Sequence, residues 1–239
     1  MSERIRFAGI LHDPAHGPLP GLLLLLTAVT GVIDAVSLLT LGRVFVANIT
    51  GTIVALGLGL AGAPGVVRET ALVALVAFVL GAYAGGRMIA RFGGHRGLLL
   101  LRATAVELVF VLVAIPVSVP LTVSVATSLR AVLAAGILAF GMGIQNAAVR
   151  RLKVPDITTT VVTMAVTGLA ADQRGGGRES ITRRVLVVLA LLAGAALGAA
   201  LVLWAGPALA LAVGALMIVV VLVVAALTSR VPQDWHKPR

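Results

Sequence analysis

Six predominantly apolar stretches, each about as long as a membrane is thick, dominate the chain. They cover residues 20–42, 69–90, 98–117, 128–149, 185–204 and 207–227. A helix needs roughly 20 apolar residues to cross the hydrocarbon core of a bilayer, so each stretch is long enough to span it. We therefore predict an all-α fold, a polytopic transmembrane helix bundle with six spans.

The composition excludes the other common classes. Hydrophobic residues make up 59% and charged residues 12%, against roughly 45–50% and about 25% in an ordinary globular domain. The mean hydropathy is +1.10, which leaves too little polar surface for a soluble domain and too much apolar surface for a disordered chain. The chain has no cysteine, so disulfides and thiolate metal sites are excluded.

Two further stretches, 44–62 and 154–171, are apolar but carry polar residues. The first contains Asn48 and Thr50, and the second contains Pro155, Asp156 and several threonines. Membranes tolerate non-helical backbone only where it is buried in protein or lines a wet cavity. We expect broken or re-entrant helices here, with Asn48 and Asp156 as helix N-caps. From Arg43 to Asn48 an extended chain reaches roughly 16 Å, about half the hydrocarbon core.

The basic residues predict the orientation. If only the six strong stretches span and the N-terminus is inside, all 19 lysines and arginines except Arg43, Arg68 and Arg130 fall on the inner side. This agrees with the positive-inside rule, and eight spans agree with it poorly. We expect a bacterial cytoplasmic (inner) membrane protein with both termini cytoplasmic. If 44–62 spans instead, the N-terminus is outside, and Arg4 and Arg6 alone separate these alternatives.

The excess of basic over acidic residues, 19 against 9, also bears on partners. In this chain the basic side chains are expected to face anionic membrane lipid. Aromatic residues are only 4%, which leaves no stacking platform for bases, so no nucleic acid partner is expected.

The chain divides into a short polar leader (1–19), one integral membrane domain (20–227) and a basic tail (228–239). Within the domain, residues 20–117 and 128–227 resemble each other. Gly31-Val-Ile-Asp-Ala in the first half matches Gly143-Ile-Gln-Asn-Ala in the second, and a polar stretch follows each. Three spans per half predict an inverted 3+3 repeat, a pattern typical of transporters.

The register of the polar stretches is open. In one register Val46–Leu56 aligns with Val154–Met164 and matches it at five of eleven positions; the linker between the matching block and the polar stretch is then four residues shorter in the second half. A second register aligns Thr50 with Thr163 and changes the length of this linker by one residue.

Polar side chains inside the spans are the candidates for function. Asp34 lies near the middle of the first span, where a carboxylate costs about 2.5–3.5 kcal/mol, so it is by default a functional residue. A carboxyl group that gains and loses a proton could couple transport to protons. Glu107 is the other carboxyl group, and we expect it to pair with Arg130 or with a polar group on another helix. The predicted substrate or ion site contains Asp34, Ser37, Arg43, Asn48, Thr50, Glu107, Gln145, Asn146, Thr159 and Thr163.

Two small-residue motifs, Gly81-x-x-x-Gly85 and Gly194-x-x-x-Gly198, allow close approach of helices. Packing within the chain is one use, and a homo-oligomer formed through these glycines is the other. The chain has no phosphate-binding loop or zinc-binding motif and no serine hydrolase motif. We expect no cofactor, no metal and no enzymatic activity, since an intramembrane enzyme would need Asp34 and Glu107 close together.

Two blocks resemble a known family. Thr30-Gly-Val-Ile-Asp-Ala-Val-Ser37 with Gly42-Arg-Val-Phe-Val-Ala-Asn-Ile-Thr-Gly51, and Gly141-Met-Gly-Ile-Gln-Asn-Ala-Ala-Val-Arg150, are similar to the YoaK family of bacterial membrane proteins of unknown function. The resemblance runs from about residue 20 to 227 and implies a cytoplasmic-membrane protein with six spans and a permease-like role. Where the family has Thr-Gly in the second half, this chain has Thr163-Met164.

These observations predict a secondary transporter, permease or facilitator for a small-molecule solute, coupled to protons through Asp34 or uncoupled. The alternative is a membrane assembly protein that binds partner helices through its glycines. In that case Asp34 would matter only for stability.

Overall fold

The structure is a computed structural model that describes residues 16–123, 128–157, 162–171, 178–229 and 235. Every regular element in these ranges is a helix, and six helices are long and apolar enough to cross a membrane: α2 (Leu19–Thr40), α4 (Arg68–Phe92), α5 (Arg96–Ser118), α6 (Leu129–Leu152), α8 (Arg178–Ala205) and α9 (Pro207–Ser229). The prediction of a polytopic helix bundle with six spans is confirmed.

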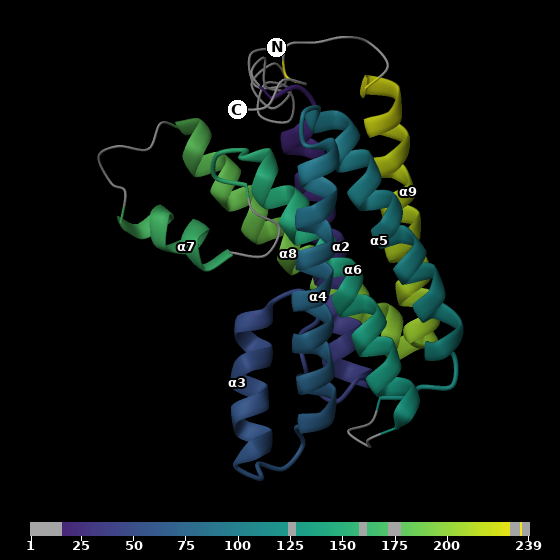
Figure 1. Cartoon of the computed structure of the whole chain (residues 1–239). Coiled ribbons are helices and arrows are strands. Elements are labelled where there is room, and N and C mark those ends of the chain that lie inside the picture. Colours follow the sequence, from purple (N-terminus) through teal and green to yellow (C-terminus); the bar gives the residue numbers. More distant parts are fainter. Residues whose placement is uncertain (1–15, 124–127, 158–161, 172–177, 230–234, 236–239) are drawn as a thin grey trace.

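Two shorter helices, α3 (Ile49–Leu60) and α7 (Val162–Ala171), follow the first helix of each half. At 1.5 Å per residue, α3 is about 18 Å long and the described part of α7 is shorter, and both lengths fall short of a hydrocarbon core of about 30 Å. Helix α3 packs beside α4, and α7 packs beside α8. They lie towards opposite ends of the bundle (Figure 1).

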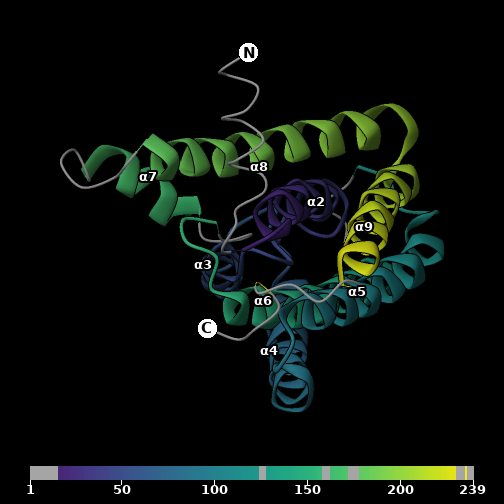
Figure 2. The same ribbon diagram turned by 90° about the horizontal axis from the view of Figure 1, so that it is seen from above.

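Helix α2 is the centre of the bundle. It packs between α8 and α9 and also contacts α6, which in turn packs against α4 and α5 (Figure 2). Most side chains along its length, from Leu19 and Leu23 to Val36, are buried. The outer helices α4 and α8 instead expose aliphatic side chains such as Leu72, Val76 and Leu192, as expected of surfaces that face lipid.

The helix bounds of the two halves correspond. Gly31 and Gly143 occupy matching positions in the two sequence blocks. The last residues of α2 and α6, Thr40 and Leu152, are the same number of residues apart in the chain as these two glycines. Likewise, the first residues of α5 and α9 are as many residues apart in the chain as their last residues. The start of α5 lies beside the end of α9, since Gly97 contacts Ser229. These equivalent helices therefore run in opposite directions.

The close contacts of the two halves correspond as well. Gly81 on α4 lies against the backbone of Phe140 on α6, and Gly194 on α8 lies against the backbone of Ala28 on α2. Phe140 and Ala28 are related by the same separation as Gly143 and Gly31. The second glycine of each motif repeats the relation, with Gly85 against Ile144 and Gly198 against Val32. The same helix interface is thus built twice.

These contacts also distinguish the two registers. The separation of Gly81 from Gly194 equals that of Thr50 from Thr163. This favours the register that sets Thr50 against Thr163. The expectation that Asp156 caps a helix is wrong, because Asp156 has a φ of +61° and the residue after it, Ile157, is not helical. The Asp156 carboxylate instead accepts a hydrogen bond from Arg184 Nε on α8 at 2.8 Å.

Alanine at Gly81 or Gly194 is expected to destabilise the bundle. The new Cβ would meet backbone of the neighbouring helix, and overpacking typically costs about 1–3 kcal/mol. Gly86, on the same helix as Gly81, would have nothing within 4 Å of an added Cβ, so Gly86→Ala is the matched control. Thermal unfolding in detergent should show lower midpoints for Gly81→Ala and Gly194→Ala only. Equal midpoints for all three variants would contradict the tight interface.

Candidate functional site

The site begins where the chain turns back after α2. Gly42 has a φ of +90° and Arg43 a φ of +59°, and this left-handed pair reverses the chain direction. A Cβ on Gly42 would lie 2.9 Å from Val67 Cβ, so only glycine has both the conformation and the space. The carbonyl of Gly42 accepts a hydrogen bond from Val67 N at 3.3 Å. The chain then returns into the protein and α3 starts at Ile49.

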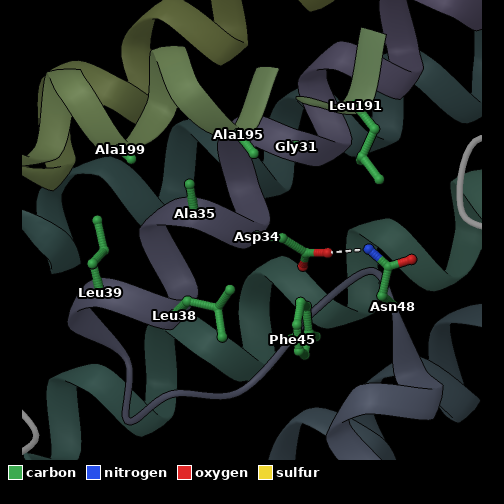
Figure 3. Close-up of a pocket in the computed structure, with 10 residues that line it drawn as sticks. All are labelled: Gly31, Asp34, Ala35, Leu38, Leu39, Phe45, Asn48, Leu191, Ala195 and Ala199. Atoms are coloured by element: carbon green, nitrogen blue, oxygen red, sulfur yellow. Dashed lines mark hydrogen bonds between the residues drawn. The ribbon is translucent and has the colours of Figure 1, made fainter. Parts of the chain in front are cut away.

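The returning segment is held by Asp34, whose side chain is only 4% exposed. Oδ1 of Asp34 accepts hydrogen bonds from the backbone N–H groups of Val46 and Ala47, each at 3.0 Å. Oδ2 accepts a third from the side-chain amide of Asn48 (Figure 3). One carboxyl group therefore satisfies donors from three consecutive residues.

This arrangement fulfils the expectation that a short helix begins directly after Asn48. The side chain of Asn48 makes no capping bond to α3 and binds Asp34 instead. The amino end of a helix carries partial positive charge and favours an anion. Here the protein supplies that anion itself, because the Asp34 carboxyl group lies at the start of α3.

A second contact secures the segment from the side of α3. The hydroxyl group of Thr52 donates a hydrogen bond to the carbonyl of Phe45, and Thr52 is fully buried. The ring of Phe45 lies over Gly51, where a Cβ would be 2.7 Å from ring carbon Cε2. Met164, which takes the place of this glycine in the second half, lies within α7 and is 68% exposed.

Next to Asp34 lies a cavity of about 290 Å³ between α2, α8 and the returning segment. Its lining is aliphatic except for Asp34, Asn48 and the ring of Phe45 (Figure 3). The α8 side consists of Leu191, Ala195 and Ala199, which sequence reasoning missed. The only sequence feature that could have pointed to these residues is the four-residue spacing of small side chains beside the Gly194 motif. The lining residues are Gly31, Asp34, Ala35, Leu38, Leu39, Phe45, Asn48, Leu191, Ala195 and Ala199.

Glu107 and Gln145 form a separate polar cluster between α5 and α6. Gln145 Nε2 donates a hydrogen bond to Glu107 Oε1 at 3.3 Å, so the partner of Glu107 is a polar group on another helix and not Arg130. The amide of the neighbouring Asn146 donates to Met142 O at 2.9 Å. Since Asp34 and Glu107 bind different elements, the described contacts do not assemble them as a carboxylate pair.

The other predicted site residues lie apart from the cavity lining. Ser37 is buried on α2, one turn beyond Asp34. Arg43, Thr50 and Thr163 are exposed, and Thr159 lies outside the described residues. The structure thus brings together Asp34 with Asn48, and Glu107 with Gln145.

The four motif glycines all pack against helices of the same chain. Gly81 and Gly85 meet α6, while Gly194 and Gly198 meet α2. A homo-oligomer through these glycines would therefore have to open contacts within the chain, and such an oligomer stays a prediction.

The fold and the site together define a class of protein: a multi-span helical membrane protein with a re-entrant segment anchored on a buried carboxyl group. Comparison with known proteins agrees with this class. Residues 22–224 match the family described as "Protein of unknown function (DUF1275)", and the chain belongs to this family. It is also 30% identical over 158 residues to the UPF0700 transmembrane protein YoaK of Bacillus subtilis (strain 168), a match that covers 64% of this chain and 67% of that protein. The resemblance to a YoaK-like family is confirmed.

Asp34→Asn is expected to release the returning segment. An asparagine replaces one of the two carboxylate oxygens by an NH₂ group, which cannot accept a hydrogen bond from the N–H donors of the segment. A buried polar group left without a partner costs about 1–3 kcal/mol. The exchange Asp34→Asn/Asn48→Asp keeps one carboxylate and one amide in contact and should restore the bonds. The chain has no cysteine of its own, so thiol labelling of an Ala47→Cys background reports the opening of the segment.

Labelling should be faster in Asp34→Asn and return towards the parent rate in the exchange variant. The thermal midpoint should fall and recover in parallel. A parent-like rate and midpoint in Asp34→Asn alone would show that another contact holds the segment.

Proposed function

We propose that this protein is a secondary transporter or facilitator for a small solute, which it moves without chemical conversion. The observation that carries the proposal is the cavity of about 290 Å³ beside Asp34, at the point where a re-entrant segment leads into the start of α3. Binding sites of secondary transporters typically lie where a discontinuous helix begins near the middle of the membrane.

The cavity wall favours a particular kind of solute. Aliphatic side chains from α2 and α8 form most of it, and the polar groups of Asp34 and Asn48 lie at one side. The Asp34 carboxyl group already accepts hydrogen bonds from the returning segment. The mainly aliphatic wall therefore supports a small, largely apolar solute.

Proton coupling through Asp34 is part of the proposal. All three described partners of the carboxyl group are N–H donors. A proton bound there would compete with one of them, which loosens the returning segment beside the cavity. Loading of Asp34 and movement of the segment would then be linked.

The correspondence of the two halves supports alternating access. Equivalent helices such as α5 and α9 run in opposite directions, and the short helices α3 and α7 lie towards opposite ends of the bundle (Figure 1). In an inverted repeat, rocking of one half against the other opens a central site to each side in turn. We propose that the two halves of this chain form such a repeat.

We also propose that the end of the bundle with the start of α2 and the end of α9 faces the cytoplasm in a bacterial inner membrane. The end of α6 lies at this end of the bundle, because Arg96 at the start of α5 bonds to the carbonyl of Leu152 and Gly97 lies against Ser229 of α9. Arg150 and Arg151 lie in the last turn of α6 and are exposed, as the positive-inside rule requires. Arg87 and Arg91, near the end of α4, are exposed as well.

A ligand screen tests the proposed site. A solute at 100 times its dissociation constant stabilises a protein by about 2.7 kcal/mol, so thermal shifts against a metabolite library should reveal it. Ala199→Leu places a larger side chain in the cavity, while Ala196→Leu makes the same change at an exposed position of α8. A hit should be lost in Ala199→Leu and kept in Ala196→Leu. A hit kept in both variants would place the binding site elsewhere, and a library without hits would count against solute binding.

Orientation is testable with single cysteines in the cysteine-free chain. Ala61→Cys lies in the exposed connection between α3 and α4, and Gly94→Cys lies in the connection between α4 and α5. In intact spheroplasts a membrane-impermeant maleimide should label Ala61→Cys only, and permeabilised cells should label both. The reverse pattern would overturn the proposed orientation.

A further inference from the structure

The pair formed by Glu107 and Gln145 lies deep in the bundle and is incompletely hydrogen-bonded. The exposed fraction is 0% for Glu107 and 1% for Gln145, and a hydrogen bond joins Gln145 Nε2 to Glu107 Oε1. Within the described part of the chain, Glu107 Oε2 and Gln145 Oε1 have no hydrogen-bond partner. Two buried acceptors of one side-chain pair are therefore left unsatisfied, which is costly in an apolar environment.

The other half of the chain shows that the packing does not require this pair. When α5 is aligned with α9 by their ends, Glu107 corresponds to Ile218. When α6 is aligned with α2 by Gly143 and Gly31, Gln145 corresponds to Ile33. Ile33 and Ile218 are both fully buried in the same hydrophobic cluster. Two isoleucines thus fill the positions that Glu107 and Gln145 fill in the first interface, so the fold alone does not explain the polar pair.

We propose that Glu107 and Gln145 form a proton-binding site, with the proton on Glu107 Oε2 donated to Gln145 Oε1. Together with the bond from Gln145 Nε2 to Glu107 Oε1, this closes a cyclic pair of a carboxylic acid and an amide. A single proton joins the two atoms that otherwise lack partners. Loading transfers the proton from a hydronium ion to the carboxylate and leaves water, and no other bond changes.

The surroundings leave Glu107 without a described cationic partner. The described ion pairs join Arg68 to Glu69 and Arg184 to Asp156. On α5 itself, Arg102 stacks over the ring of Phe92 at 3.6 Å, and Arg96 donates to the carbonyls of Leu152 and Trp235. The charged residues of the helices packed against α5 lie near the helix ends: Arg68, Glu69, Arg87 and Arg91 on α4, and Arg130, Arg150 and Arg151 on α6. Helix α9 has no charged residue.

Infrared spectroscopy of the purified protein tests the proton directly. Glu107→Gln keeps the shape and a hydrogen-bonding amide but cannot hold this proton. The wild type should show the C=O stretching band of a protonated carboxylic acid, shifted in D₂O, and Glu107→Gln should lose it. Potentiometric titration should count one bound proton fewer in that variant. The Asp34→Asn/Asn48→Asp exchange is the control and should keep the band. An identical spectrum and proton count in the wild type and Glu107→Gln would overturn the proposal.

The double variant Glu107→Ile/Gln145→Ile tests whether the pair is structural. It copies the side chains of the other half, and apolar replacement of a buried polar pair is often neutral or stabilising. Its thermal midpoint should equal or exceed that of the wild type, while Glu107→Ile alone should be lower because Gln145 loses its partner. A double variant well below the wild type would assign the pair to folding and overturn a proton-binding role. Neither experiment depends on transport, so this proposal stands or fails separately from the proposed function.

Discussion

The docking of the returning segment onto Asp34 is the interaction on which the site depends. A chain that re-enters a membrane carries backbone N–H groups that helix bonds do not satisfy, and each costs several kcal/mol in hydrocarbon. Asp34 accepts those of Val46 and Ala47 and binds the amide of Asn48. These bonds dock the segment against α2 directly before α3 begins, and the cavity forms beside the same carboxyl group.

Close helix packing provides the frame for this docking. Glycines bring α8 onto α2 and α4 onto α6 at backbone distance, and α2 carries Asp34 through the centre of the bundle. Without a hydrophobic driving force between helices in lipid, such contacts depend on small side chains. The contacts of the two motif glycines correspond in the two interfaces, so each interface can be compared with the other. Gly81 and Gly194 make the same contact in the two interfaces and therefore belong to the shared packing. The pair of Glu107 and Gln145 occurs in one interface and has no counterpart in the other.

The two halves anchor their broken segments differently. In the first half Asp34 holds the segment from within the bundle, and the equivalent residue of the second half is Asn146, which donates to Met142 O. In the second half Asp156 instead forms an ion pair with Arg184 on α8.

The six spans and the two broken helices were predictable from the sequence, because the length of an apolar run and the cost of polar backbone in lipid act locally. The start of a helix after Asn48 followed for the same reason, and Asp34 stood out because a carboxyl group inside a span is costly. The partners did not: three N–H donors on Asp34, the amide of Gln145 on Glu107, and the ion pair of Asp156 all join residues far apart in the chain. The cavity wall from α8 and the choice between the two registers also needed the tertiary structure. Those features depend on how helices approach in space, and an apolar sequence specifies that a helix is buried without specifying which neighbour buries it.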